Sequence, residues 1–344
     1  MNPAPQNILI VRTDRIGDLV LTLPMASALR KKYPAARISF LVRAYTADLL
    51  KGHPFIDEVI LLAEKNGRPD TASNSKTLRS RKFDTAIAVS PDLRVALMLF
   101  RAGIPVRIGT GYRWYSFLFN ERIFEHRKTA AKHEAEYNFS LLRPLGITEP
   151  LTEESADYSV KIDQEALSAV TGLLKDHGVK SPFIIVHPGS GGSAVDLPAD
   201  KMKSLVRLFA EKTDLGIVLT GSEKEVNLCS ELEVHGRTCS LAGKLSLLEL
   251  TALSSLSSLF IANSTGPIHI AASLGTPTAG FYPKITVCSP RRWRPYSAGS
   301  LVFTPQLDCS NCTREQCEKL DCMNTIDISY VFNEITTKLL KNRS

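Results

Sequence analysis

The sequence contains no long apolar segment. None of its apolar runs approaches the roughly 20 residues that a membrane-spanning helix requires, so we expect no transmembrane segment. A signal peptide is also missing, because the apolar stretch at residues 7–11 is too short and no small-residue cleavage site follows it. These absences predict a cytoplasmic protein.

Signs of nucleic-acid binding are missing as well. The sequence has no helix rich in Lys and Arg and no ladder of aromatic and basic residues, so we expect no nucleic-acid partner. Its charge excess is modest, with 42 Lys and Arg residues against 35 Asp and Glu residues and a net charge of +7. An excess of this size favours a phosphorylated substrate or an anionic membrane surface as the partner.

A pattern of apolar strands and amphipathic helices is present, and it occurs twice. It predicts strands at residues 8–12, 37–42, 58–62 and 85–89, and again at 183–187, 216–220, 258–262 and 278–281. Short Val, Ile and Leu runs between helices are typical of parallel sheets covered on both faces. We therefore predict an α/β fold of two doubly wound domains, residues 1–160 and 161–326, followed by a C-terminal helix in residues 327–344.

The turn at residues 263–277 has the features of an anion-binding site. A short buried strand is followed by Ser and Thr, a Gly, and Pro267 at the start of a small-residue helix that ends at Gly275. Such a turn directs unsatisfied N–H groups and the positive end of the helix dipole at one point, and His269 lies about one turn inside. The alternative is an ordinary capped strand-to-helix connection.

Three further turns follow predicted strands. In residues 11–18, Gly17 permits a tight turn, and Asp18 is either a helix cap or a carboxylate that accepts a proton from a hydroxyl. Residues 187–193 combine three glycines with two serines, which suits a diphosphate, although they match neither the dinucleotide fingerprint nor a P-loop. Residues 220–225 carry acidic side chains that either bind a ribose or favour the helix dipole.

Together these segments resemble the lipopolysaccharide heptosyltransferases, glycosyltransferase family 9. The resemblance covers nearly the whole chain. It rests on the opening at residues 8–24, on AGIPVRIG at 102–109, and on residues 116–122, 141–147, 187–190, 220–221 and 263–276. It implies a GT-B fold of two Rossmann-like domains facing a cleft, and inverting transfer of heptose from ADP-heptose to an inner-core sugar hydroxyl without a metal cofactor.

The resemblance also implies roles for individual residues. Asp18 would be the catalytic base and ADP the leaving group. The second domain would bind the donor. Its diphosphate would meet Ser264, Thr265, Gly266 and the loop Ser190, Gly191, Gly192 and Ser193; the adenine would lie near Lys244 and Leu245, the ribose near Glu223 or Glu225, and His269 would contact the donor.

The acceptor would bind the first domain. It would be a lipid-linked saccharide at the cytoplasmic face of the inner membrane, and basic residues of this domain suit its phosphate or carboxylate groups. Our candidates are Arg15, Arg94 and Arg122. We also expect residues 66–77 to form a mobile loop over the acceptor, and the C-terminal helix to pack back on the first domain.

Two departures from the family pattern bear on the donor. Many members have Asp at the position of Ser264, and many have a Lys and a Trp in the segment that here is residues 195–198. We expect Arg12 or Arg15 to supply the missing cation. The alternatives are a family member that uses another nucleotide sugar or acceptor, a two-lobed protein that binds a phosphorylated ligand without turnover, and a nucleotide-sugar epimerase. An epimerase would need an acid/base set in the second domain, and we find none.

Four cysteines cluster near the C-terminus. Cys309, Cys312, Cys317 and Cys322 have a spacing compatible with a structural tetrahedral zinc site. The alternative is plain thiols, since a cytoplasmic location argues against disulfides. We interpret Cys229, Cys239 and Cys288 as small core residues.

Overall fold

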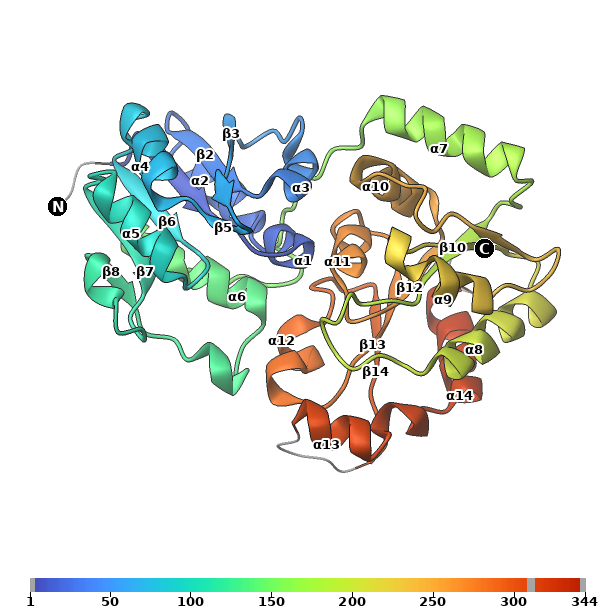
Figure 1. Cartoon of the computed structure of the whole chain (residues 1–344). Helices are drawn as coiled ribbons and strands as arrows, with labels where there is room; N and C mark the ends of the chain where they lie inside the picture. The colour runs from blue at the N-terminus through green and yellow to red at the C-terminus, as the bar shows by residue number, and fades with distance from the viewer. Residues whose placement is uncertain (1–3, 308–312, 341–344) are drawn as a thin grey trace. The chain divides into compact units, whose positions relative to one another are not determined.

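The computed structural model describes residues 4–307 and 313–340, which form two compact units (Figure 1). Unit 1 contains the residues up to 127 together with 134–161. Unit 2 contains residues 128–133 together with the chain from 162 onward. Cys309 and Cys312 lie outside the described residues.

Unit 1 is built around a parallel six-stranded sheet in the order β3-β2-β1-β6-β7-β8. The strands are β1 (Asn7–Val11), β2 (Arg37–Val42), β3 (Glu58–Leu61), β6 (Thr85–Ala88), β7 (Val106–Thr110) and β8 (Glu121–Ile123). The helices are α1 (Ile16–Val20), α2 (Pro24–Lys32), α3 (Ala44–Ala47), α4 (Thr71–Ser80), α5 (Leu93–Arg101) and α6 (Glu134–Phe139). The four predicted strands form within one residue of their expected ends. β7 and β8 were not predicted, because their short segments carry Arg and Gly.

Unit 2 repeats this arrangement with the strand order β11-β10-β9-β12-β13-β14. The strands are β9 (Phe183–His187), β10 (Gly216–Leu219), β11 (Thr238–Ser240), β12 (Leu259–Asn263), β13 (Thr278–Phe281) and β14 (Ser300–Phe303). The helices are α7 (Gln164–Asp176), α8 (Ala199–Lys212), α9 (Val226–Glu231), α10 (Leu247–Leu256), α11 (Gly266–Ser273), α12 (Pro290–Trp293), α13 (Arg314–Lys319) and α14 (Ile328–Ile335).

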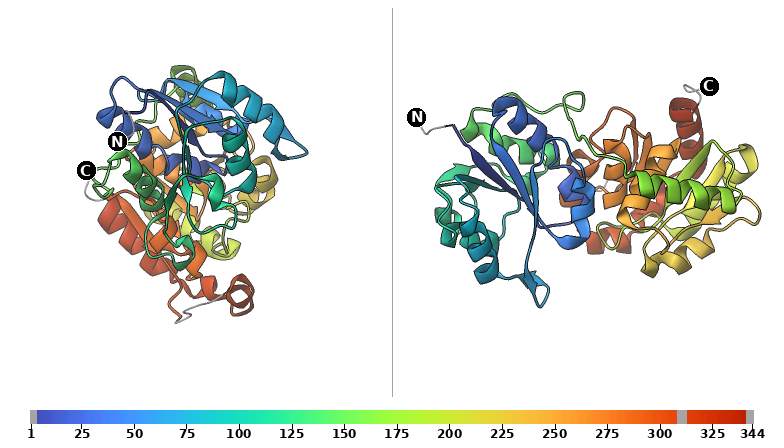
Figure 2. Two further views of the ribbon diagram at one scale, coloured as in Figure 1. Left: turned by 90° about the vertical axis from the view of Figure 1, so that its left-hand side faces the viewer. Right: turned by 90° about the horizontal axis from the view of Figure 1, so that it is seen from above.

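The sheet of unit 2 has an apolar layer on each face. Ile184 and Val186 of β9 belong to the layer under α8 and α14, whereas Phe183 and Ile185 belong to the layer under α7, α10 and α11. In Figure 1, α7 (light green) lies above the strands of unit 2 and α14 (red) below them, and in the view from above in Figure 2 α7 lies in front of the strands. Successive residues of one strand point to opposite faces, and both faces are buried here, so every position of the strand is apolar in the sequence.

The C-terminal helix belongs to unit 2, and its packing on the first domain stays a prediction. Ile328, Val331, Phe332 and Ile335 of α14 lie in the same core layer as α8, and the rings of Phe332 and Phe209 are 5.0 Å apart. Residues spaced by three and four positions form one apolar stripe on a helix. This stripe packs against α8 in the core of unit 2.

The segment expected to be a mobile loop is different from the prediction. Residues 64–69 form a small hairpin, β4 (Glu64–Lys65) and β5 (Arg68–Pro69), and α4 follows. Asp70 caps α4 by accepting hydrogen bonds from the N–H groups of Ala72 and Ser73. Asn74 is buried and bonds both backbone groups of Ala63, which anchors the hairpin to the helix.

Within the described ranges, no helix is both long and apolar enough to cross a bilayer.

Candidate active site

The strand order of each sheet marks where a ligand is expected. All strands of each sheet are parallel, but the order in which successive strands are added reverses between β1 and β6 in unit 1 and between β9 and β12 in unit 2. In doubly wound sheets, ligands bind beyond the carboxyl ends of the strands at such a point. The residues that follow these four strands are therefore the candidates.

Asp18 lies at this point in unit 1, on the first turn of α1, and its side chain is 16% exposed. Arg15, not Asp18, occupies the N-cap position of the helix. The carboxylate of Asp18 is instead paired with the guanidinium of Arg12, which follows β1 directly. The interpretation of Asp18 as a simple helix cap is therefore wrong.

Arg12 is 2% exposed and is surrounded by polar groups of its own unit. Its Nε lies 3.2 Å from Oδ2 of Asp14, and its Nη2 lies 3.6 Å from Oε1 of Glu134. Its Nη1 donates to Oδ1 of Asn138 at 3.2 Å. Because these groups hold the guanidinium inside unit 1, the expectation that Arg12 supplies a cation to the donor is not supported.

The electrostatics of this cluster favour a basic Asp18. Burial raises the pKa of Asp18, Arg12 acts against the rise, and the carboxylates of Asp14 and Glu134 add to it. Burial would lower the pKa of Arg12, but the three carboxylates outweigh it and the net change is upward. Glu134 also pairs with Arg127, so three carboxylates share two guanidinium groups. A carboxylate with a raised pKa is a stronger base, which suits proton abstraction.

Sequence reasoning missed Asp14, Glu134 and Asn138. Glu134 and Asn138 lie one turn apart on α6, more than 110 residues from Arg12 in the sequence. Asn138 also donates to the carbonyl of Leu21 at 3.2 Å. Ser90, after β6, donates to Oδ1 of Asp14 at 2.8 Å. A polar pair one helical turn apart was the only sequence signal for this contact.

The three acceptor candidates are not gathered at one place. Arg15 is exposed beside α1, and Arg94 is exposed on the first turn of α5, where its Nη1 lies 3.5 Å from the carbonyl of Pro69. These two follow the neighbouring strands β1 and β6. Arg122 lies instead on the edge strand β8, and its Nε donates to the carbonyl of Phe119.

The turn after β12 in unit 2 has the expected geometry, with one difference. Thr265 occupies the N-cap position of α11 and Pro267 lies in its first turn, but no side-chain cap from the described residues closes this end. The first N–H groups of a helix have no partner within the helix. They are therefore left for a ligand, and half-buried Ser264 lies beside them.

His269 is buried within this helix and is 5% exposed. Burial lowers its pKa to about 3, so the imidazole is neutral. Its Nδ1 is buried and has no hydrogen-bond partner among the described residues. The same holds for the hydroxyl of Tyr282, just after β13. Sequence reasoning did not identify Tyr282.

The glycine-rich loop after β9 is held in a fixed shape. Asn263 accepts a hydrogen bond from the N–H of Leu197 at 2.9 Å and donates to the carbonyl of Pro188 at 2.6 Å. Arg314 donates to the carbonyls of Gly192 and Ala194, at 3.1 and 2.7 Å. Gly191 and Gly192 have φ values of 56° and 75°, which favour glycine. The loop is therefore a turn held by hydrogen bonds rather than a flexible linker.

Asp196 lies in this loop, within the segment that departs from the family pattern. Burial raises its pKa to about 6, against the effect of nearby Ser190. Oδ1 of Asp196 and Oγ of Ser190 are buried, and no described residue partners them in good hydrogen-bond geometry. Sequence reasoning missed Asp196 because its importance depends on burial.

The two predicted ribose residues differ in their surroundings. Glu225 accepts hydrogen bonds from the N–H and Oγ of Ser222 at 2.7 and 2.8 Å, which is a capping box. These bonds outweigh burial and lower its pKa. A Cβ on Gly189 would overlap Oε1 of Glu225, so this carboxylate supports the loop.

Glu223 lies with the predicted adenine residues. It is exposed, and a Cβ on Gly243 would lie 3.3 Å from its Cα. Lys244 and Leu245 follow that glycine directly, and the N–H of Gly243 bonds the carbonyl of Gly221 at 2.9 Å. The structure therefore brings Glu223, Lys244 and Leu245 together.

The cysteine cluster is only partly described. Cys317 and Cys322 are buried beside Ile285 in a small apolar cluster. The described residues contain no group of three metal-ligating side chains, and two of the four cysteines lie outside them. The zinc site stays a prediction.

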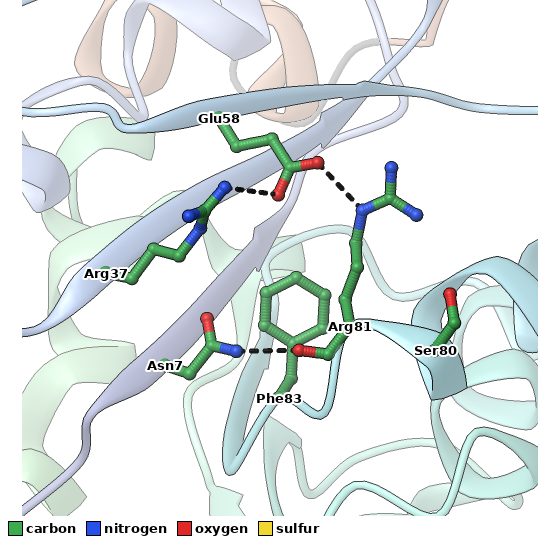
Figure 3. A pocket seen from close by; sticks show the side chains of 6 residues that line it. All are labelled: Asn7, Arg37, Glu58, Ser80, Arg81 and Phe83. Atoms are coloured by element: carbon green, nitrogen blue, oxygen red, sulfur yellow. Dashed lines mark hydrogen bonds and ion pairs between the residues drawn. The ribbon is translucent and has the colours of Figure 1, made fainter.

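A pocket of about 550 Å³ lies at the opposite end of the unit 1 sheet (Figure 3). Asn7, Arg37 and Glu58, at the amino ends of β1, β2 and β3, line it together with Ser80, Arg81 and Phe83. Glu58 accepts from Nη2 of Arg37 at 3.2 Å and from Nε of Arg81 at 2.8 Å. This position is away from the carboxyl ends where ligands of such sheets bind.

Comparison with known proteins identifies the chain. The family model for glycosyltransferase family 9 (heptosyltransferase) matches residues 72–322. The chain belongs to glycosyltransferase family 9. A Haemophilus influenzae protein described as a glycosyltransferase is 30% identical over 298 residues, which are 84% of this chain and 86% of that protein.

Two further similar proteins carry heptosyltransferase names. Lipopolysaccharide heptosyltransferase 3 of Escherichia coli is 27% identical over 297 residues, 83% of this chain and 84% of that protein. The structure of the Escherichia coli ADP-heptose LPS heptosyltransferase II superposes with a TM-score of 0.78 at 21% identity, covering 98% of this chain and all of that one. Membership of family 9, glycosyltransferase activity and the doubly wound α/β fold predicted from the sequence are confirmed.

Proposed function

We propose that this family 9 enzyme transfers heptose from ADP-heptose to a hydroxyl of a lipopolysaccharide inner-core sugar, with inversion and without a metal ion. The observation that carries the proposal is Asp18, a carboxylate with a raised pKa held beside buried Arg12 at the ligand-binding edge of unit 1. Such a carboxylate accepts a proton readily. The named relatives that act on heptose support the donor assignment.

The proposed step balances as follows. A carboxylate oxygen of Asp18 takes the proton of the acceptor hydroxyl, and the hydroxyl oxygen attacks the anomeric carbon of the donor. The bond between that carbon and the β-phosphate oxygen breaks, and ADP departs with the electron pair. Attack opposite to the leaving group inverts the anomeric centre.

Unit 2 supplies the groups that receive the leaving ADP. The open N-terminus of α11, at Thr265 and Gly266, stabilises the negative charge that develops on the diphosphate. In the loop at Ser190, Gly191, Gly192 and Ser193, the N–H of Ser193 bonds the carbonyl of Ser190 at 3.1 Å, and the N–H groups of Ser190 and Gly191 face the carboxyl groups of Asp196 and Glu225. The groups of this loop proposed to contact the diphosphate are therefore the N–H of Gly192 and the hydroxyl of Ser190. Lys244 and Leu245 would contact the adenine, Glu223 the ribose, and Nδ1 of neutral His269 the donor.

The acceptor is proposed to be a lipid-linked saccharide at the cytoplasmic face of the inner membrane. Arg15 and Arg94, after neighbouring strands, would bind its acidic groups. Arg122 would lie further along the acceptor, because it is on the edge strand.

The test of this function is the Asp18→Asn variant in a transfer assay that follows ADP release and labelled product. We expect transfer to fall by about 10²- to 10⁴-fold, the usual contribution of a general base, while donor binding measured by thermal stabilisation is kept. Asp48→Asn, at an exposed carboxylate of the same unit, is the matched control and should transfer normally. Normal turnover by Asp18→Asn would remove Asp18 from this role.

Two residues in the proposed donor site favour testing another nucleotide sugar as the donor. Ser264 offers a hydroxyl where many family members have a carboxylate, and Asp196 places a carboxyl group beside the diphosphate loop. Thermal stabilisation against ADP, UDP, GDP and CDP separates the donors, since stabilisation grows with ligand concentration over Kd. A preference for UDP would overturn ADP-heptose while leaving the transfer chemistry intact.

A further inference from the structure

Unit 1 exposes an unusual group of aromatic side chains beside the edge of its sheet. Tyr112, Trp114, Phe117 and Phe124 are 44%, 76%, 65% and 61% exposed. All four lie between the end of β7 and the residue after β8, the last strand of the sheet. We call these four residues the aromatic face. Large apolar side chains that gather on a surface usually mark an interaction site.

Hydrogen bonds hold the loop that carries Trp114 and Phe117, and these bonds keep both side chains exposed. Ser116 donates from Oγ to the carbonyl of Thr110 at 2.6 Å and accepts from the N–H of Arg113 at 3.0 Å. Successive three-residue turns, Ser116 N–H to Arg113 and Leu118 N–H to Tyr115, give the segment a 3₁₀ register. In this register, residues three apart lie on one face.

That register divides the aromatics into two sets. Tyr115 and Leu118 point into the core of unit 1, together with Phe119. Trp114 and Phe117 are also three apart and therefore share the outer face.

The other two aromatics are also held outward. The rings of Tyr112 and Phe124 meet edge to face at 5.5 Å, and Tyr112 stacks on His126 at 3.6 Å. Gly111 bonds the carbonyl of Ile123, and a Cβ on Gly111 would lie 2.5 Å from the ring of Phe124. The glycine thus lets the two strands bring this pair together.

The segment that carries the aromatic face is rich in arginine. Residues 93–127 contain six arginines, no lysine, no aspartate and two glutamates, a net charge of +4 out of +7 for the whole chain. One of the glutamates, Glu125, is paired with Arg143 at 2.9 Å. Arg113 is exposed between Tyr112 and Trp114. An exposed arginine beside exposed aromatic rings suits an anionic membrane surface, where the cation meets lipid headgroups and the rings enter the interface.

We propose that the aromatic face docks on the surface of an anionic phospholipid bilayer. Trp114 and Phe117 would enter the interfacial region, where amphipathic rings are favoured, and Arg113 would meet lipid phosphates. This inference rests on the proposed function in one respect, since a lipid-linked acceptor lies in such a surface. Net charge alone would attract the protein to the bilayer weakly and in no fixed orientation. Inserted aromatic rings would determine which surface of unit 1 faces the lipid.

The first test uses the fluorescence of Trp114. The chain has two tryptophans, and Trp293 is half-buried with its Nε1 bonded to the carbonyl of Val287 at 2.8 Å. In a Trp293→Phe variant, Trp114 is the only reporter. With vesicles of phosphatidylethanolamine and phosphatidylglycerol, we expect its emission to move to shorter wavelength and brominated lipid to quench it. Unchanged emission with vesicle-bound protein would overturn the proposal.

The second test compares matched double variants by vesicle flotation. We expect Trp114→Ser with Phe117→Ser to weaken binding by about tenfold or more, because two inserted rings are removed. Leu256→Ser with Tyr330→Ser is the control. It removes two side chains of unit 2 that are 41% and 53% exposed and should bind as the parent does. Arg113→Gln should weaken binding mainly at low salt. Equal binding by both double variants would overturn the proposal.

Activity separates this inference from the proposed function. The Trp114→Ser, Phe117→Ser variant should transfer normally to a water-soluble, delipidated acceptor and poorly to an acceptor embedded in vesicles. Loss on both acceptors with unchanged vesicle binding would mean that the aromatic face binds the saccharide, and would overturn lipid docking. Failure of the proposed function would appear differently, as normal transfer by Asp18→Asn, and would leave the vesicle measurements unaffected.

Discussion

Arg12 pairs its Nη2 with Oδ1 of Asp18 while only 2% of its side chain is exposed. The same guanidinium lies within 3.6 Å of Glu134 and 3.2 Å of Asp14. One buried cation therefore connects the strand-to-helix turn after β1 with α6. It holds the proposed base in place and also decides how basic that carboxylate is.

Replacing Arg12 should affect both stability and activity. Arg12→Met leaves three carboxylates with reduced compensation, and breaking a buried charge pair costs about 3–5 kcal/mol. We expect the urea midpoint to fall accordingly. Arg12→Lys keeps the charge but loses the contact with Asn138 and should fall in between. Arg12 lowers the pKa of Asp18, so a weaker contact in Arg12→Lys should raise that pKa. The acid limb of the pH–rate profile of Arg12→Lys should therefore move to higher pH. An unmoved limb would contradict the assignment of Asp18 as base.

Asp196 should make the protein less stable as the pH rises. Its folded-state pKa is about 6, above the ordinary value of 3.8, so the folded state binds the proton more tightly. Unfolding then becomes easier as the pH increases from about 4 to about 6. Asp196→Asn removes this effect and should be more stable than the parent at pH 7.5 by about 1–2 kcal/mol, allowing for partial solvent access. Urea unfolding at pH 4.5 and 7.5 checks it, and equal differences at both pH values would contradict it.

Asn263 should control the shape of the donor loop. Asn263→Ala removes the bonds to Leu197 and Pro188, and a buried group left unpaired costs about 1–3 kcal/mol. We expect lower thermal stability and a raised KM for the donor, with little change in the KM for the acceptor. Asn263→Asp keeps the acceptor for Leu197 but places a buried carboxylate oxygen against the carbonyl oxygen of Pro188, and should disturb the loop at least as much as Asn263→Ala. Equal effects on both KM values would point to general unfolding.

Gly189 and Gly172 form a matched pair of glycine substitutions. A Cβ on Gly189 would overlap the carboxylate of Glu225, so Gly189→Ala should push this side chain out of its bonds with Ser222, lower stability and weaken donor binding. Gly172 lies on α7 with nothing within 4 Å of an added Cβ. Gly172→Ala should stabilise the protein by up to about 1 kcal/mol, as alanine does in a helix. Thermal unfolding with and without ADP measures both, and a neutral Gly189→Ala would show that the loop is not constrained by Glu225.

Much of the fold could be predicted because its elements are local. The strands at β1, β2, β9 and β10 are continuous apolar runs, and the turns after them carry glycine and polar residues where a ligand edge is expected. The ordered motifs also predicted the family. β7 and the edge strand β8 were missed because their half-buried segments carry Arg and Gly and lack a continuous apolar run.

The sequence by itself determined the family, the two doubly wound sheets and the position of Asp18 after the first strand, since these depend on neighbouring residues and on their order. Only the tertiary structure decided what surrounds Asp18, because Glu134 and Asn138 come from a distant helix. It also placed α14 on α8 and turned Trp114 and Phe117 outward while Tyr115 turned inward. Burial and long-range pairing depend on which surfaces meet in space.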